Sequence, residues 1–163
     1  MNALNTLTDN PAPESNHPAH QDSVITQLMQ NYAHFNRDTV DTIVQLYHAD
    51  ALFIDPVKTV EGRDQLHAYF SAMAEGLLEC QFTFNQVLTQ INADSVHQAS
   101  LFWTMHYRHP KLRGGALLEL AGTSHIKYSD TIIYHRDYYD LGQMLYQHLP
   151  LLRQVIAIIK NRM

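Results

Sequence analysis

Three widely separated places in the chain hold side chains that could move a proton within a small molecule. Tyr32 lies in an apolar stripe, Asp55 directly precedes a proline, and His135 stands two positions before Asp137. Carboxylates and imidazoles are common general acids and bases, and a tyrosine hydroxyl can donate to a developing negative charge. Acid/base catalysis is therefore the chemistry that these residues favour, provided that one fold brings them into the same apolar hollow.

The histidine and the second aspartate lie in a late stretch rich in β-branched and aromatic residues, which predicts a strand. Alternate side chains of a strand point to opposite faces, so Ile133, His135, Asp137 and Tyr139 share one face. That face could line an interior cavity. Alternatively, Asp137 could join Arg136 in an ordinary ion-pair network on the surface.

The other candidates also have plain structural interpretations. Asp55 could simply end a strand, because the residue before a proline is pushed into extended geometry. Tyr32 could be a core tyrosine whose hydroxyl bonds a backbone carbonyl. Trp103, on a predicted central strand, could serve packing alone.

The elements that must position these residues follow from hydrophobic periodicity. Apolar residues at helical spacing predict helices over 22–36 and over 63–78. Between them, a second short helix is expected after Asp38, with Tyr47 on its buried face. Runs of β-branched and aromatic residues between turn signals predict strands over 51–55, 80–91, 95–108, 116–128 and 131–140. One or two further helices are expected over 141–161.

Helices followed by a long strand meander are typical of an α+β fold. Three helices cannot cover both faces of so many strands, and a strongly curved sheet wrapped on them solves that problem and leaves a concave pocket. We expect a disordered polar tail over 1–20, one domain over 21–145 and a C-terminal helical extension over 146–163.

Composition, charge and motifs argue against several kinds of partner. The chain has 163 residues, a net charge of −5 and a pI of about 6.1, and without a basic stripe no nucleic-acid partner is expected. Cys80 is the single cysteine, and neither a secretory signal nor a run of about 18 apolar residues is seen, so we expect a cytoplasmic protein without membrane contact. No zinc-type histidine spacing or phosphate loop appears, so neither a metal nor a cofactor is expected.

The stretch 47–63 carries a D-A-x-x-x-D-P … G-R pattern and resembles the NTF2-like superfamily, also described as cystatin-like, over about 22–145. That group includes ketosteroid isomerases, SnoaL-type polyketide cyclases and limonene-epoxide hydrolases. The resemblance implies a cone-shaped, strongly curved antiparallel sheet wrapped on three N-terminal helices, and a homodimer formed through the sheet. It implies no single activity, because the fold hosts enzymes, transport factors and passive binders.

The ketosteroid isomerases are similar in the first half of the chain. Their general base is an Asp before Pro at the end of the first strand, which matches Asp55, and their first oxyanion donor is a Tyr on the first helix, which matches Tyr32. Their second donor is an Asp kept neutral by its apolar site. Ser124, a weaker donor, stands at the matching position.

The epoxide hydrolases are similar in the second half. Their last strand reads W-R-D-Y-F-D-L, close to residues 135–141, and its first Asp, which matches Asp137, helps activate water. In those enzymes this face looks into the cavity, which implies that His135 looks in beside Asp137. Their Arg-x-Asp pair is absent here, and their Tyr-x-Asn pair has become Phe53-x-Asp55.

Two hypotheses follow. In the first, an apolar pocket takes a small hydrophobic ligand with a polar tip, either only binding it or acting as an isomerase, cyclase or hydrolase. Its catalytic groups would be Asp55 as base, with Asp137, His135 and Tyr32, and its ligand contacts Ser124, Trp103, Phe53 and Tyr139. In the second, the protein is a non-catalytic module that uses the curved sheet as an interaction surface.

Overall fold

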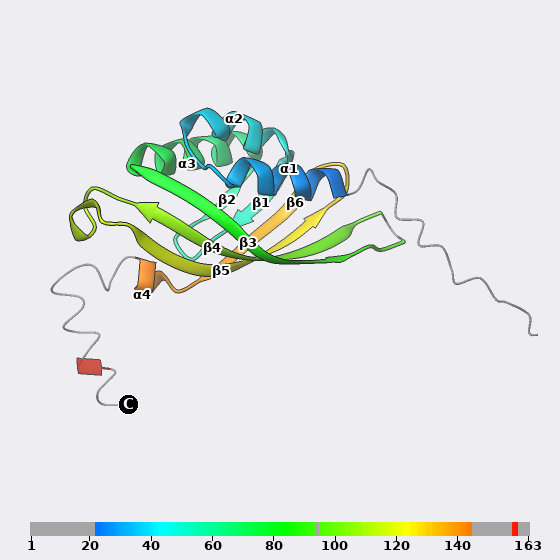
Figure 1. Ribbon diagram of the computed structural model, residues 1–163. Coiled ribbons are helices and arrows are strands. Elements are labelled where there is room, and N and C mark those ends of the chain that lie inside the picture. The colour runs from blue at the N-terminus through cyan, green and yellow to red at the C-terminus, as the bar shows by residue number, and fades with distance from the viewer. Residues whose placement is uncertain (1–21, 94, 145–157, 160–163) are drawn as a thin grey trace, which may run out of the picture.

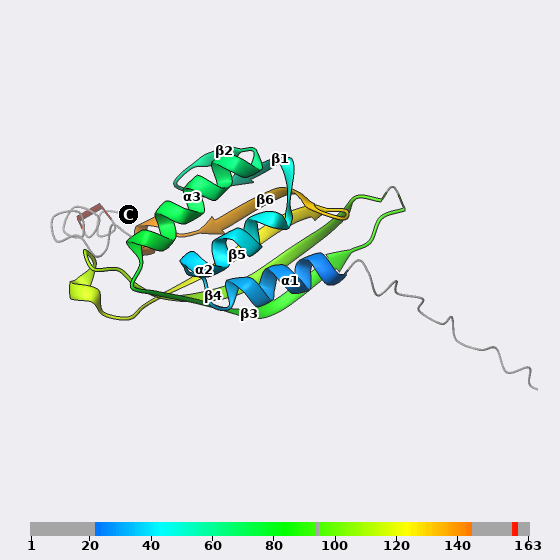
Figure 2. The ribbon, with the colours of Figure 1, turned by 90° about the horizontal axis from the view of Figure 1, so that it is seen from above.

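A curved six-stranded sheet carries three helices on its concave face, as a computed structural model shows (Figure 1). The structure describes residues 22–93, 95–144 and 158–159. The strand order is β2-β1-β6-β5-β4-β3, so the chain's second strand and its third strand form the two edges. The predicted α+β class is confirmed, with the helices preceding the long strands in sequence and covering one face of them in space (Figure 2).

Three amphipathic helices form the upper layer: α1 (Asp22–Tyr32), α2 (Arg37–Gln45) and α3 (Arg63–Gly76). The start of α2 is fixed by a capping box, in which the Asn36 side chain accepts from the Thr39 amide while the Thr39 hydroxyl accepts from the Asn36 amide. α3 begins after Gly62, whose φ of 85° suits a residue without a side chain. Each helix turns its apolar stripe toward the sheet.

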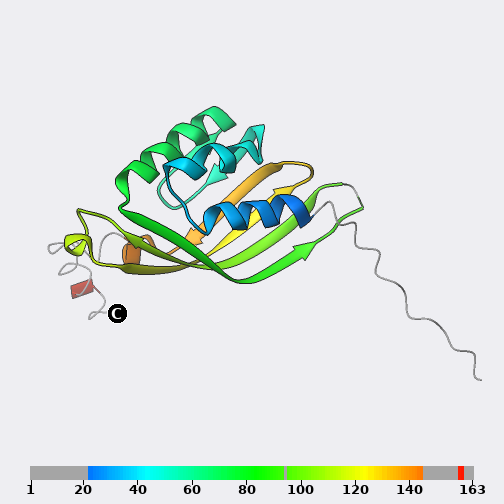
Figure 3. The same cartoon turned by 45° about the horizontal axis from the view of Figure 1, so that its top comes forward.

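The lower layer consists of β1 (Tyr47–Ile54), β2 (Thr59–Glu61), β3 (Glu79–Gln90), β4 (His97–Arg108), β5 (Leu118–Tyr128) and β6 (Ile132–Tyr139). The last four strands form the predicted antiparallel meander. The sheet as a whole is mixed, however, because β1 pairs with β6 in parallel. It stays open and is strongly bent beneath the helices (Figure 3).

β1 begins earlier than the sequence predicts. Tyr47 was expected on the buried face of the second helix, because it follows Val44 at helical spacing. The structure shows this expectation to be wrong: α2 ends at Gln45, and Tyr47 is the first residue of β1, with an exposed fraction of 0 %. A buried residue three positions after the last helical contact fits both elements, so spacing alone could not distinguish them.

A register shift near the start of β6 moves one side chain to the other face. Simple alternation placed Ile133 inward with His135, but the pairing between β5 and β6 slips between Lys127 and Tyr128, and Ile132 is the buried residue. Beyond this irregularity the expected alternation returns.

A short helix, α4 (Leu141–Met144), follows the last strand. The Tyr107 hydroxyl donates to the Met144 carbonyl over 2.8 Å, which fixes this helix against β4. The expected N-terminal tail lies outside the described residues, as does the expected C-terminal extension apart from residues 158–159. In the described ranges, no helix combines the length and the apolar character needed to span a membrane.

Candidate functional site

Asp137 on β6 lies at the centre of a hydrogen-bond network on the face of the sheet that the helices cover. Its Oδ1 atom accepts from the Ser124 hydroxyl on β5 at 2.5 Å and lies 3.0 Å from Nε2 of His135. Ser124 and Asp137 are directly opposite each other in the β5–β6 pairing, and His135 precedes Asp137 on the same face. Sheet register therefore brings all three side chains together.

The serine is oriented by a tryptophan. Nε1 of Trp103 donates to Ser124 Oγ over 2.9 Å. An indole N–H can only donate, so the serine oxygen must accept this bond, and its single proton is left for Asp137. The indole fits because Gly122 pairs with Trp103 on the neighbouring strand: a Cβ atom at Gly122 would lie 2.2 Å from the Trp103 ring.

On the other side of the imidazole lies Tyr47, a site residue that the sequence did not suggest. Its hydroxyl oxygen is 2.6 Å from Nδ1 of His135, and the two rings are parallel within 2°, with centroids 6.0 Å apart. Burial raises the pKa of the Tyr47 hydroxyl well above its ordinary value, while the neighbouring Tyr32 hydroxyl lowers it in part and Asp137 raises it further. No local signal in the sequence distinguishes Tyr47 as a strand residue, because it also fits the helical spacing after Val44.

Tyr32 on α1 faces the same hollow from above. Its hydroxyl is buried and makes no hydrogen bond of good geometry with any described residue, although it lies within electrostatic reach of Tyr47. Burial, and then the neighbouring Tyr47 and Asp137, raise the pKa of Tyr32, so the group stays a neutral donor. A carbonyl partner in the backbone, the plain alternative for this residue, is not found among the described bonds.

Asp55, at the end of β1, has all of its described bonds committed to local structure. Oδ1 accepts from the amides of Val57 and Lys58, each at 2.7 Å, and Oδ2 accepts from the Tyr69 hydroxyl of α3 at 2.5 Å. Asp55 also lines the hollow. Asp55 therefore does both things that the sequence presented as alternatives: it ends the strand in a turn and it faces the hollow.

Two adjoining cavities lie between the helices and the sheet. The larger offers about 50 Å³ to water-sized molecules and the smaller about 10 Å³. A single water needs about 10–15 Å³ on this measure, so the smaller cavity has room for about one. The two cavities meet at Tyr32, Phe82, Trp103 and Asp137, which line both.

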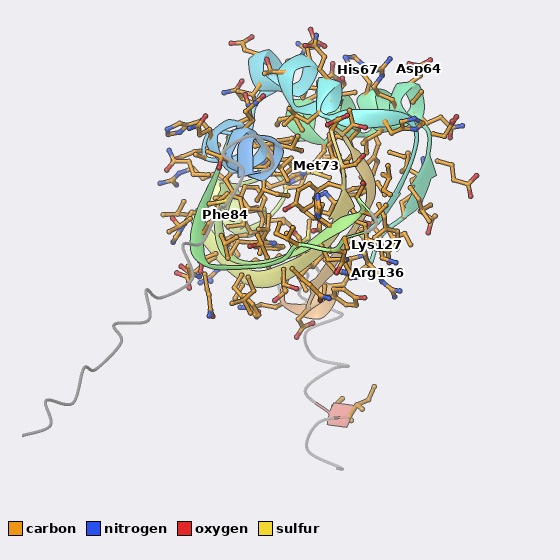
Figure 4. All side chains as sticks on the ribbon, turned by 90° about the vertical axis from the view of Figure 1, so that its right-hand side faces the viewer. Asp64, His67, Met73, Phe84, Lys127 and Arg136 are labelled. Atoms are coloured by element: carbon orange, nitrogen blue, oxygen red, sulfur yellow. The ribbon has the colours of Figure 1, made fainter. Side chains whose placement is uncertain are left out.

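The lining of the larger cavity is aromatic and carries no described cation. Its rings belong to Tyr32, Phe35, Phe53, Phe70, Phe82, Trp103 and Tyr139. Its charged groups are the two carboxylates of Asp55 and Asp137, with no Lys or Arg among the lining residues. Met73 contributes from α3, and Figure 4 shows it between the two layers, whereas Asp64 and His67 lie on the outer side of the helices. Such a hollow favours an uncharged ligand over an anion.

All eight residues named from the sequence line one of the two cavities: Tyr32, Phe53, Asp55, Trp103, Ser124, His135, Asp137 and Tyr139. Arg136, by contrast, lies on the opposite face, with its guanidinium carbon 4.9 Å from the centre of the Tyr138 ring. The surface pairing of Arg136 with Asp137 does not form. Among the described residues, no group of three His, Cys, Asp or Glu side chains is placed to hold a metal ion.

The arrangement of the site can present one carboxylate oxygen to a ligand. Both described hydrogen bonds of Asp137 go to Oδ1, so Oδ2 has no partner in the part of the chain that the structure describes. A neutral phenol, Tyr32, lies across the same hollow. An oxygen that accepts a proton and a hydroxyl that donates one are the two groups that moving a proton within a small molecule requires.

An open, curved sheet that carries three helices over an apolar hollow is the fold of NTF2-like and ketosteroid isomerase-like structures. The chain belongs to the SnoaL-like domain family, which it matches over residues 29–135. None of the curated proteins compared with the chain matches it in sequence.

Solved structures share the fold at low sequence identity. A protein of ketosteroid isomerase-like fold from Catenulispora acidiphila, in complex with trimethylamine, has a TM-score of 0.63 and 14% identity, over 78% of this chain and 93% of that one. A protein from Shewanella denitrificans, provisionally named a SnoaL-like polyketide cyclase, has a TM-score of 0.61 and 16% identity, over 78% and 95%. An NTF2-like protein from Salmonella enterica has a TM-score of 0.60 and 13% identity, over 72% and 86%. At these identities the likeness shows the fold alone.

Proposed function

We propose that the protein catalyses cofactor-independent proton transfer on a small, uncharged, largely apolar molecule, as an isomerase, cyclase or hydrolase. The observation that carries the proposal is the Asp137 carboxylate, held on one oxygen by Ser124 and His135 at the edge of two apolar cavities. A structural carboxylate would be expected to use both oxygens, as Asp55 does. Asp137 is 16 % exposed, which leaves it accessible to a ligand.

In this proposal Oδ2 of Asp137 takes a proton from a carbon next to a carbonyl group. The electron pair of the broken C–H bond forms the carbon–carbon double bond of an enolate, and the carbonyl oxygen gains negative charge. Tyr32 donates a hydrogen bond to that oxygen, which stabilises the charge in a dry site. The proton then returns from Asp137 to the same or another carbon.

Asp55 is the weaker candidate for the base. Its two oxygens already accept three hydrogen bonds, and removing them from those partners would open the turn between β1 and β2. Its role as base stays a prediction. Phe53, Trp103 and Tyr139 would hold the apolar part of the ligand by ring contacts.

Hydrogen–deuterium exchange tests the proposal without a known substrate. Small neutral ketones such as cyclopentanone and cyclohexanone are incubated with the protein in D2O, and loss of the proton signal next to the carbonyl is followed by NMR. We expect exchange faster than in buffer, and a loss of about 100-fold or more in Asp137→Asn, the usual contribution of a general base.

The matched control is Asp50→Asn, because the Asp50 side chain is 92 % exposed and lies away from the cavities. It should leave exchange unchanged. Wild-type exchange at the buffer rate for every ketone, or equal exchange in Asp137→Asn, would contradict the proposal. Binding of the same ketones without exchange would support the alternative, a passive binding module.

We further propose a cytoplasmic homodimer that pairs through the outer face of the sheet. Phe102 on β4 and Tyr138 on β6 are 37 % and 48 % exposed there, and both align with Thr123 of the strand between them, so one partner surface could cover both. Light scattering after size exclusion should give twice the chain mass for the wild type. Phe102→Glu should give a monomer, and a wild-type monomer would contradict this part of the proposal.

A further inference from the structure

Tyr47 is buried behind the candidate site and lines neither cavity. Its exposed fraction is 0 %, and its one described side-chain hydrogen bond joins its hydroxyl to Nδ1 of His135 at 2.6 Å. The imidazole lies end to end with the Tyr47 ring across this bond, in a nearly parallel plane, and Phe53 meets it edge-on, with centroids 5.1 Å apart and an angle of 73°. The position of Tyr47 therefore matters through His135.

The partners of the imidazole determine which nitrogen carries its proton. Nε2 lies 3.0 Å from Oδ1 of Asp137, which favours hydrogen on this nitrogen, because two lone pairs that face each other repel. Tyr47 keeps its own proton, since burial raises the pKa of the hydroxyl. A neutral imidazole with hydrogen on Nε2 then has Nδ1 available as an acceptor, and the Tyr47 hydroxyl lies at donor distance.

We propose that Tyr47 is a positioning residue, which holds His135 as the Nε2–H tautomer and so directs its donor to Oδ1 of Asp137. The Ser124 hydroxyl donates to the same oxygen from the other side. With both donors on Oδ1, Oδ2 remains the atom that meets a ligand. This inference rests on the proposed function for its catalytic meaning, but the tautomer itself is a property of the protein alone.

Nitrogen NMR of the histidine rings tests the inference on the full chain without ligand. One-bond and multiple-bond ¹⁵N–¹H spectra show which ring nitrogen is protonated, and loss of one signal set in His135→Gln assigns His135. In the wild type we expect a protonated Nε2 and an unprotonated Nδ1 shifted by an accepted hydrogen bond. In Tyr47→Phe that Nδ1 shift should disappear, and the single tautomer should give way to a mixture.

Tyr107→Phe is the matched control. It also removes the hydroxyl of a buried tyrosine that makes one described hydrogen bond, but its partner is the Met144 carbonyl and not His135. It should leave the His135 signals unchanged. A merely structural role of Tyr47 would alter thermal stability in both variants but would not change the tautomer of His135.

A protonated Nδ1 in wild-type protein would overturn the inference, and this measurement needs no variant to fold. Identical His135 signals in the wild type and in folded Tyr47→Phe would overturn it as well. The ketone exchange assay separates the two proposals: an Nε2–H tautomer that depends on Tyr47, found in a protein that exchanges no ketone, would support the positioning role and reject the catalytic function.

Discussion

Two carboxylates share one hollow, and their partners give them different roles. Asp55 accepts two backbone amides on one oxygen and a tyrosine hydroxyl on the other, so it joins the turn after β1 to α3. Asp137 accepts only on Oδ1 within the described part of the chain. The same side chain is thus mainly a structural acceptor at the first position, and at the second it keeps one oxygen free of described partners, as the proposed base requires.

Stability measurements can distinguish these roles. Asp55→Asn replaces one acceptor oxygen with a donor, which leaves either the backbone amides or Tyr69 without an acceptor, and should lower the free energy of unfolding by about 1–3 kcal/mol. Asp137→Asn keeps an amide oxygen for Ser124 and His135, and should change it by less than about 1 kcal/mol. Urea denaturation measures both values, with Asp50→Asn as the surface control. Equal losses in the two variants would indicate that Asp137 is structural.

The two buried tyrosines of the site should respond to loss of their hydroxyls with opposite signs. The Tyr32 hydroxyl makes no well-formed described bond, so Tyr32→Phe removes a buried unsatisfied group and should leave the free energy of unfolding unchanged or raise it by up to about 1 kcal/mol. Tyr47→Phe leaves Nδ1 of His135 without its donor and should lower it by about 1–2 kcal/mol. Thermal and urea unfolding of the pair check this. A clear loss of stability in Tyr32→Phe would show that its hydroxyl has a structural partner.

At the scale of elements, the sequence predicts the long strands from their own residues, but it does not predict which distant strands pair. The long strands β3 to β6 follow from their own residues, and His135 and Asp137 share a face because strands alternate. The parallel pairing of β1 with β6 is different, because it joins segments about 80 residues apart that no local pattern connects. Tyr47 was misplaced for this reason: the strand that contains it is defined by a partner far along the chain.

Gly122 on β5 makes room for the Trp103 ring, whose indole donates to Ser124. A methyl group at Gly122 would overlap the Trp103 ring at 2.2 Å, and the indole would have to move away from Ser124. Gly122→Ala should therefore lower the free energy of unfolding by about 1–3 kcal/mol, the usual range for overpacking.

The position of the indole can be followed directly, because Trp103 is the only tryptophan in the chain. In Gly122→Ala its fluorescence should shift to longer wavelength as the ring becomes more exposed. Ala121→Ser, next to Gly122 at an exposed position, should leave the spectrum as in the wild type. An unshifted spectrum in Gly122→Ala would mean that the sheet adjusts without moving the ring.

At the scale of the whole molecule, the space between the helices and the sheet is filled by aromatic rings, several of which are tyrosines with buried hydroxyls. Edge-to-face contacts link Tyr32, Tyr47 and Phe53 to Phe70 of α3, so helices and strands share one core. The cavities are the gaps that this packing leaves at Asp137. A site built in this way is apolar and also rich in neutral hydroxyl groups, and those groups titrate only in base.

Alkaline pH should therefore unfold the protein cooperatively. Burial raises the pKa of Tyr107 and of Cys80 to about 12 each, and it raises the pKa of Tyr32, Tyr47, Tyr69 and Tyr139 as well. A pKa that is higher in the folded state gives stability that is fully present below the unfolded pKa, which is 9.0 for the thiol and 10.0 for the phenols. The stability is lost as the pH rises through about 12.

Parallel titrations by tyrosinate absorbance and circular dichroism test this expectation. The buried tyrosines should ionise together, in step with the loss of strand signal. Protein unfolded in urea provides the reference, in which all tyrosines should titrate near pH 10. If every tyrosine of the folded protein ionised near pH 10 while the strand signal persisted, the hollow would be open to water. The dry site that the proposed proton transfer requires would then be absent.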